Sequence, residues 1–253
     1  MHFLCLHGSR TNSKVFEMQS LPIRDALGED HTYDFVEGCC ASEITADSME
    51  KATSTGGFFY ADLDDVDGSC VNALKDLESY AIDNGPFDGV LGYCEGAAWA
   101  AALIIYRSLT GQSGLFQCAV LFAAPPPQDA LAIVVEAMKQ ARPTNPNQHQ
   151  QHLPSESSGL NGNAPLASAT PDLQTLYKGA ELIHIPTAHI YGANDTEHPQ
   201  CGPPFRQACR SDVREEFVHS CQHRLPGASA SEDIAGVVRA IRRTVQRASE
   251  SSA

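Results

Sequence analysis

Apolar and polar residues follow one another in blocks along this chain, and two kinds of block recur. Short, mainly apolar runs end at glycine, proline or polar residues, as in strands that are covered on both faces of a sheet. Between them lie longer segments in which apolar residues recur every three or four positions, the period of an amphipathic helix. The strand-like runs are residues 3–6, 32–36, 90–91, 118–123, 185–192 and 216–219.

The helix-like segments alternate with these runs. A first helix is expected after Ser13, which can cap it, and Pro22 is expected to interrupt or bend it. Further helices are expected over residues 71–80, 95–109, 130–138 and 205–209, and from Ser231 onward. This alternation predicts an α/β protein with a mostly parallel sheet and helices on both of its faces.

Two segments depart from the alternation. Residues 42–67 are polar and glycine-rich, and they are expected to form an irregular excursion with an aromatic patch at residues 58–60. Residues 139–172 are rich in Gln, Asn, His, Ser and Pro. This low-complexity composition predicts an insertion that acts as a lid, as a docking surface or as a passive mobile loop. With this insertion included, residues 1–253 are expected to form a single domain.

Composition narrows the range of partners. The chain carries 17 basic and 31 acidic residues, a formal net charge of −14, which argues against binding to nucleic acid or to an anionic membrane. No stretch has the length of a membrane span, and the first residues lack a basic leader, so a cytoplasmic protein with reduced thiols is expected. The nine cysteines show no paired C-x-x-C spacing, and neither a metal nor another cofactor is expected.

The run Gly92-Tyr93-Cys94-Glu95-Gly96 has the outline of a nucleophile elbow, G-x-S-x-G, with cysteine in place of serine. Glycines at both ends let the backbone turn sharply and let the following helix pack closely. Cys94 then projects at a helix N-terminus, whose partial positive charge favours a thiolate. An arbitrary cysteine is more often a small buried hydrophobe, but the strand–elbow–helix context favours a nucleophile.

An acid and a base follow the elbow in the chain. Asp195 comes directly after a predicted strand, where its carboxylate can hold an imidazole in the required tautomer. His223 and His219 both lie near the last predicted strand, and each can serve as the general base, with His184, His189 and His198 as weaker candidates. The residues alone do not decide which of His219 and His223 is the base.

Further residues complete the predicted site. The oxyanion hole is expected to use the backbone N–H groups of Glu95 and Ser9, the latter brought close by His7-Gly8. Tyr93, Phe58 and Phe59 are candidates for binding substrate, whereas Trp99 on the elbow helix is expected in the core. The Glu95 carboxylate either favours the helix dipole or opposes the Cys94 thiolate.

Four sequence blocks, in order along nearly the whole chain, resemble the FSH family of serine hydrolases, which are small α/β-hydrolases. They are LCLHGSRTNSKVFEMQ, FDGVLGYCEGAA, IPTAHIYGANDT and HSCQHRLP. The order of nucleophile, acid and histidine is also that of α/β-hydrolases. The last block resembles a family motif whose second histidine is the base, which selects His223. The chain departs from the family at Cys94 and Glu95, where serine and glutamine are usual.

The resemblance implies acyl transfer, because the family includes esterases and thioesterases that release polyketide chains from a synthase carrier domain. A thiolate exchanges one thioester for another at little cost in energy, so Cys94 suits thioesters or activated lactones better than simple esters. The expected substrate is therefore a small-molecule acyl thioester, released by hydrolysis or by intramolecular lactonisation. The elbow is also similar to that of dienelactone hydrolase, so an activated-lactone hydrolase is an alternative. A non-catalytic binder that keeps the fold is another.

Overall fold

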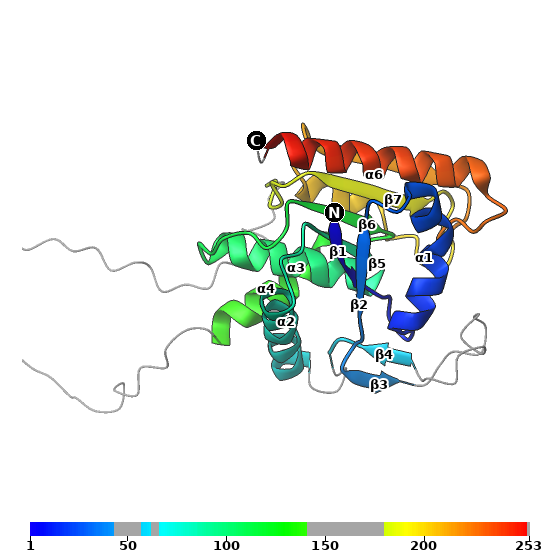
Figure 1. Cartoon of the computed structure of the whole chain (residues 1–253). Helices are drawn as coiled ribbons and strands as arrows, with labels where there is room; N and C mark the ends of the chain where they lie inside the picture. The colour runs from blue at the N-terminus through cyan, green and yellow to red at the C-terminus, as the bar shows by residue number, and fades with distance from the viewer. Residues whose placement is uncertain (43–56, 62–65, 141–179, 252–253) are drawn as a thin grey trace, which may run out of the picture.

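The computed structural model describes residues 1–42, 57–61, 66–140 and 180–251 (Figure 1). The expected low-complexity insertion at 139–172 therefore lies outside the described residues, apart from Lys139 and Gln140, which form the end of a helix. Most of the expected excursion at 42–67 also lies outside them.

A six-stranded sheet forms the centre of the molecule, with strand order β2-β1-β5-β6-β7-β8. Every neighbouring pair of strands in it is parallel, so the prediction of a mostly parallel sheet is confirmed. The strands are β1 (His2–Leu6), β2 (Thr32–Val36), β5 (Gly89–Tyr93), β6 (Cys118–Phe122), β7 (Thr187–Gly192) and β8 (Arg214–His219).

Helices cover both faces of this sheet, as Figure 1 shows. Helices α1 (Ser13–Leu27) and α6 (Ser231–Ser251) pack together on one face. Helices α2 (Val66–Asp83), α3 (Glu95–Leu109) and α4 (Pro127–Gln140) pack together on the other. A short 3-10 helix, η2 (Pro203–Ala208), contacts α4.

Strand β1 shows why the strands are apolar without interruption. Phe3 and Cys5 point into the core under α1 and α6, whereas Leu4 and Leu6 point into the core under α2, α3 and α4. All four residues are at most 1% exposed. Because successive residues of a strand face opposite sides, a strand between two helix layers needs apolar residues at every position.

The strand order locates the reactive edge of the sheet. From β1 the chain moves outward to β2, and it then returns to place β5 on the other side of β1. The helices that follow β1 and precede β5, α1 and α2, lie on opposite faces. In open α/β sheets, such a switch point leaves a crevice at the carboxyl ends of the two strands, where ligands bind. His7 follows β1 and Cys94 follows β5 at this point.

Helix α1 differs from expectation at two residues. Asn12, and not Ser13, is its N-cap, and the Asn12 Oδ1 accepts a hydrogen bond from the Val15 N–H at 2.9 Å. Pro22 lies inside the helix without ending it. A proline cannot donate to the carbonyl four residues earlier, which here belongs to Met18. Met18 is 42% exposed, so water can satisfy that carbonyl.

The excursion at 42–67 is more ordered at its two ends than expected. Strand β3 (Cys40–Ser42) pairs antiparallel with β4 (Gly57–Phe59). Strand β4 also joins the loop after β1: the Phe58 N–H donates to the Thr11 carbonyl at 2.8 Å, and the Arg10 N–H donates to the Phe58 carbonyl at 3.0 Å. This small sheet, which we call the β3–β4 hairpin, holds aromatic side chains against the reactive edge. None of the helices in the described part of the chain is both long and apolar enough to cross a membrane.

The tight contact between α3 and the end of β1 yields a stability prediction. A Cβ atom at Gly96 would lie 2.2 Å from the Leu6 carbonyl oxygen, so Gly96→Ala must push α3 away from β1. We expect the free energy of unfolding to fall by about 1–3 kcal/mol, despite the better helix propensity of alanine. Gly227→Ala is the matched control, because its Cβ would meet nothing within 4 Å. Urea unfolding of both variants measures the difference, and equal stabilities would contradict the packing argument.

Candidate active site

The carboxyl ends of four parallel strands bring the predicted catalytic residues together. Cys94 follows β5, Asp195 follows β7 and His223 follows β8. His7 follows β1 and is fully buried. Because all these strands run in the same direction, their ends meet at one edge of the sheet.

Cys94 stands on a sharp turn between β5 and α3. Its φ of 51° and ψ of −115° form a conformation that residues with a Cβ rarely adopt and that costs about 1–3 kcal/mol. The turn is tight on both sides: a Cβ at Gly92 would lie 2.6 Å from the Ala97 Cα, and one at Gly96 would collide with the Leu6 carbonyl. Both glycines have the close-packing role expected for them, and the sulfur is presented at the N-terminus of α3.

Asp195 and His223 form a hydrogen-bonded pair. The Asp195 Oδ2 lies 2.7 Å from the His223 Nδ1, and both side chains are less than a tenth exposed. The other carboxylate oxygen, Oδ1, accepts from the N–H groups of Glu197 at 3.1 Å and His198 at 2.8 Å. Burial opposes ionisation of Asp195, but the hydrogen bonds from His198 and His223 outweigh it and hold the pKa of Asp195 below its ordinary value. A carboxylate in this position fixes the imidazole with Nε2 free for chemistry.

Two close contacts hold His223 in place. The Tyr93 hydroxyl donates to the His223 carbonyl at 3.0 Å, and the two rings lie 5.6 Å apart. The turn before His223 passes so close to Gly192 that a Cβ there would lie 1.7 Å from the Gln222 carbonyl. Tyr93 therefore lies beneath the histidine loop, and its proposed contact with substrate remains a prediction.

The rival histidine, His219, is directed elsewhere. Its Nδ1 accepts from the Cys221 N–H at 3.2 Å, and it is 4% exposed. Burial lowers the pKa of His219, so it is neutral at pH 7. Of the two histidines that the residues alone left open, His223 is the one that contacts Asp195, and its role as the base remains a prediction.

The environment of Cys94 favours its thiolate. A hydrogen bond with the Cys201 side chain is the largest cause, and together with the hydrogen bond and charge of His223 it outweighs burial and lowers the pKa of Cys94 well below its ordinary value. Burial by itself lowers the pKa of His223, but the bonds and charges of Cys94 and Asp195 reverse this and raise it. Both pKa shifts favour a thiolate on Cys94 paired with an imidazolium on His223.

The loop after β1 lies directly beside the nucleophile. A Cβ at Gly8 would come within 3.4 Å of the Cys94 Cβ and 3.0 Å of the Tyr93 ring. His7 fixes this loop through its ring: the Gly38 N–H donates to Nε2 at 2.9 Å, which leaves Nδ1 to donate to the Gly8 carbonyl at 2.7 Å. Ser9 follows and is exposed. Its N–H, like that of Glu95 in the first turn of α3, remains the predicted oxyanion donor.

Glu95 connects the elbow helix to the β3–β4 hairpin. Its Oε1 accepts from the Tyr60 N–H at 3.2 Å and from the Trp99 Nε1 at 3.1 Å. Tyr60 in turn accepts a bond from the His7 N–H at 2.8 Å through its hydroxyl. Burial raises the pKa of Glu95, and the charge of Cys94 adds to this rise. The opposition between carboxylate and thiolate that we considered is present, but the direct contacts of Glu95 are with Tyr60 and Trp99. Trp99 is 2% exposed, so its expected place in the core is confirmed.

The two remaining aromatic candidates lie on β4. Phe58 and Phe59 are half-buried, and the Arg10 guanidinium lies 5.8 Å from the centre of the Phe59 ring. Through the bonds between β4 and residues 10–11, both aromatics flank the loop that carries Ser9. This position fits a substrate-binding wall, a role that remains a prediction.

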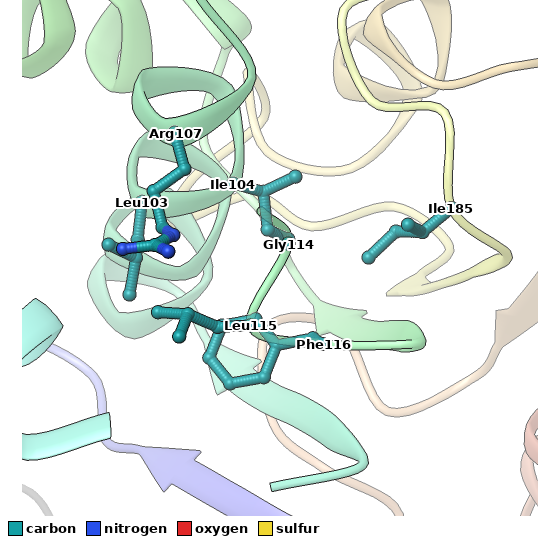
Figure 2. Close-up of a pocket in the computed structure, with 7 residues that line it drawn as sticks. All are labelled: Leu103, Ile104, Arg107, Gly114, Leu115, Phe116 and Ile185. Atoms are coloured by element: carbon teal, nitrogen blue, oxygen red, sulfur yellow. The ribbon is translucent and has the colours of Figure 1, made fainter. Parts of the chain in front are cut away.

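A separate cavity lies away from this site (Figure 2). It is lined by residues at the far end of α3 and in the segment that leads into β6, namely Leu103, Ile104, Arg107, Gly114, Leu115 and Phe116, together with Ile185 before β7. Its volume is about 30 Å³, room for a water molecule and too little for an acyl chain.

One residue of the site was not anticipated, and another was expected only as a weaker rival for the base. The Cys201 side chain is the largest cause of the lowered pKa of Cys94, and the His198 ring lies 4.3 Å from the His223 ring. Both belong to the turn after Asp195, and no spacing in the sequence marks them. The Asp195 backbone contacts that fold this turn are the only local signal, since aspartate often accepts from N–H groups two or three residues ahead.

The parallel sheet, the elbow and the ordered triad define an enzyme of the α/β-hydrolase fold. The chain matches the model of the serine hydrolase (FSH1) family over residues 1–233, and it belongs to that family. It is 29% identical over 256 residues to esterase FPY3 of Fusarium mangiferae, across 98% of each chain. It is 25% identical over 209 residues to esterase tropF of Talaromyces stipitatus, across 76% of this chain and 66% of that one.

Among solved structures, the RedJ thioesterase from the prodiginine biosynthetic pathway in Streptomyces coelicolor has a similar fold. The TM-score is 0.50 at 10% identity, and the match covers 94% of this chain and 89% of that one. The chain is thus a hydrolase, and a cysteine stands at its elbow in a family described by its serine nucleophile.

The ionisation of Cys94 is directly testable. Peptide-resolved iodoacetamide labelling across a pH series should give Cys94 a pKa well below that of an ordinary cysteine. His223→Ala removes a hydrogen bond and a positive charge that both lower this pKa, so the value should rise. His219→Gln is the control, since His219 accepts from the Cys221 N–H, and it should leave the pKa of Cys94 low. An ordinary pKa for the wild-type thiol would contradict the resting ion pair.

Proposed function

We propose that this enzyme transfers acyl groups through an acyl-Cys94 intermediate, releasing an acyl chain from a carrier thioester. The single observation behind this proposal is the placement of a cysteine at the elbow beside the Asp195–His223 pair. Family membership supports hydrolysis of an acyl bond. The thiolate, the imidazole and the carboxylate supply the nucleophile, the acid–base group and the orienting group that such chemistry needs.

In the first step the Cys94 thiolate attacks the thioester carbonyl. Negative charge develops on the carbonyl oxygen, within reach of the Glu95 N–H and, in this proposal, the Ser9 N–H. The tetrahedral species collapses with loss of the carrier thiolate, which takes the proton from the His223 Nε2. Asp195 keeps the His223 imidazole in position while the imidazole changes from charged to neutral.

Sulfur explains the choice of substrate. Attack of a thiolate on a thioester exchanges like for like, so the acyl-enzyme forms with little change in free energy. Attack on an ordinary oxygen ester would trade a more stable bond for a less stable one. A cysteine at this elbow therefore favours thioesters over simple esters as substrates.

In the second step an acceptor takes the acyl group from Cys94. Neutral His223 removes a proton from water, giving hydrolysis, or from a hydroxyl of the same acyl chain, giving a lactone. The shape of the pocket and its access to water decide between the two. A polyketide chain on a synthase carrier domain fits both outcomes, and the thioesterase fold shared with RedJ is consistent with such a donor.

Intact-protein mass measured after brief mixing with a simple acyl thioester tests the covalent route. The wild type should gain the mass of one acyl group, and Cys94→Ala should gain none while losing activity by about 10⁵-fold or more. Acylation at another residue would overturn the assignment of Cys94. Turnover of activated lactones but not of thioesters would favour a dienelactone-type hydrolase. Neither an adduct nor turnover, in a protein whose Cys94 is reactive towards iodoacetamide, would favour a binder.

The role of Asp195 gives a separate prediction. Asp195→Asn keeps the shape of the side chain but removes the charge that holds His223 in its working tautomer. We expect kcat for thioester release to fall by about 10³-fold or more. Asp233→Asn is the matched control: this carboxylate accepts from Ser220 at 2.6 Å on the loop before His223 and does not contact the imidazole pair. Equal losses in the two variants would show that loop stability, and not the tautomer, is at stake.

A further inference from the structure

Two cysteines that are far apart in the chain are fixed side by side at the end of β6. The Cys94 N–H donates to the Phe122 carbonyl at 2.9 Å, and the Gly202 N–H donates to the Ala124 carbonyl at 2.7 Å. The segments that carry Cys94 and Cys201 are therefore anchored two residues apart on the same strand end. Cys201 is 6% exposed, although it lies in a loop.

The turn that carries Cys201 is packed firmly over the site. The Cys201 N–H donates to the His198 carbonyl at 2.9 Å, and the His198 ring lies 4.3 Å from the His223 ring. On the other side, a Cβ at Gly202 would lie 2.5 Å from the Tyr191 ring. The backbone is thus held on both sides of Cys201, and the Cys201 side chain acts on the Cys94 thiol as the largest cause of its lowered pKa.

Cys94 differs chemically from the buried cysteines Cys5, Cys118 and Cys209. Burial raises the pKa of Cys118 and of Cys209 to about 12 and that of Cys5 further still, so these thiols stay protonated. The pKa of Cys94 is shifted in the opposite direction. Peroxides react with thiolates and not with thiols, so Cys94 is the sulfur that an oxidant attacks first.

We propose that Cys94 and Cys201 form a peroxide-sensitive dithiol site. A reversible disulfide between them blocks the Cys94 sulfur and protects it from irreversible oxidation. The proposal goes beyond acyl transfer and does not depend on which acyl group the enzyme carries. It depends on the fixed neighbourhood of the two sulfurs and on the base beside them.

The chemistry balances with hydrogen peroxide as the oxidant. The Cys94 thiolate attacks one peroxide oxygen, the O–O bond breaks, and the departing hydroxide takes a proton from the His223 imidazolium to become water. Cys94 is now a sulfenic acid, oxidised by two electrons. Neutral His223 then removes the Cys201 proton, the Cys201 sulfur attacks the Cys94 sulfur, and the S–O bond breaks with release of a second water. A small-molecule thiol reduces the resulting disulfide.

The second cysteine is suited to this order of events. In the reduced protein, its hydrogen bond with Cys94 and the Cys94 charge are major causes that raise the pKa of Cys201, so Cys201 does not compete for peroxide. Once Cys94 becomes an uncharged sulfenic acid, its negative charge no longer opposes ionisation of Cys201. Cys201 then loses its proton more readily, at the moment when its attack is required.

Peptide mapping of the full-length protein tests the proposal without any acyl substrate. The reduced protein is treated with hydrogen peroxide, blocked with N-ethylmaleimide and digested with trypsin under non-reducing conditions. Trypsin places Cys94 in the peptide 76–107 and Cys201 in the peptide 179–206, and each of these peptides contains one cysteine. We expect these two peptides to be joined by a disulfide that dithiothreitol reverses, and Cys94 to become inaccessible to iodoacetamide in parallel.

Variants separate this result from general thiol oxidation. Cys201→Ser should abolish the cross-link, leave a dimedone-reactive sulfenic acid on Cys94 and then allow irreversible sulfinic acid to accumulate there. Cys221→Ser is the matched control, because Cys221 is a partly exposed thiol on the loop before His223, and it should form the cross-link normally. A wild-type protein that shows no Cys94–Cys201 cross-link, or in which Cys94 pairs with another cysteine, overturns the proposal. Failure of the acyl-thioester assay alone would leave this mapping result unaffected.

Discussion

The approach of helix α3 to the end of strand β1 is the constraint on which the reactive edge depends. Gly96 lies against the Leu6 and His7 carbonyls with no room for a Cβ. This contact sets the N-terminus of α3, and Cys94 with it, beside the loop after β1. The predicted oxyanion hole, made of one N–H from the helix and one from the loop, requires this neighbourhood. A helix held further away would separate the nucleophile from half of the predicted oxyanion hole.

Electrostatic stabilisation of the sulfur is local and does not come from the protein as a whole. The chain has a net charge of −14, which disfavours an additional anion. The thiolate is instead favoured by the Cys201 hydrogen bond, by His223 and by the helix N-terminus. Asp195 is stabilised in the same way, because two backbone N–H groups and the imidazole offset its burial. Short-range hydrogen bonds in a partly buried site thus outweigh a long-range field that water screens.

The sequence predicted the features that depend on local pattern. Apolar runs such as Phe3–Leu6 indicated strands covered on both faces, and the spacing of Gly92, Cys94 and Gly96 indicated the elbow. The base was different: His219 and His223 are both close to β8, and the resemblance to a family motif was needed to choose between them. His223 is placed by the close approach of Gln222, in the loop after β8, to Gly192 at the end of β7. This contact joins residues that are distant in the sequence, so no local pattern records it.

Other features could not be predicted because they depend on tertiary contacts. Pro22 remains inside α1, where Met18, the residue whose carbonyl it leaves without a donor, is exposed. The β3–β4 hairpin forms because the loop at Thr11 offers β4 a backbone partner. Cys201 meets Cys94 only because two loops are anchored at the end of the same strand. In each case the deciding partner is distant in the sequence.

The contacts of Glu95 also have a mechanical consequence. A single carboxylate oxygen accepts from the Tyr60 backbone at the end of the hairpin and from the Trp99 indole in the core. Its other oxygen, Oε2, is buried without a hydrogen-bond partner in the described part of the chain. An outward movement of the hairpin would break the hydrogen bond from the Tyr60 N–H to the Glu95 carboxylate. Because the other carboxylate oxygen has no partner among the described residues, this loss would cost free energy. Through Glu95, the chain segment that follows β4 is thus tied to helix α3, whose N-cap is Cys94, so the spacing between the hairpin and the sulfur is set by the fold.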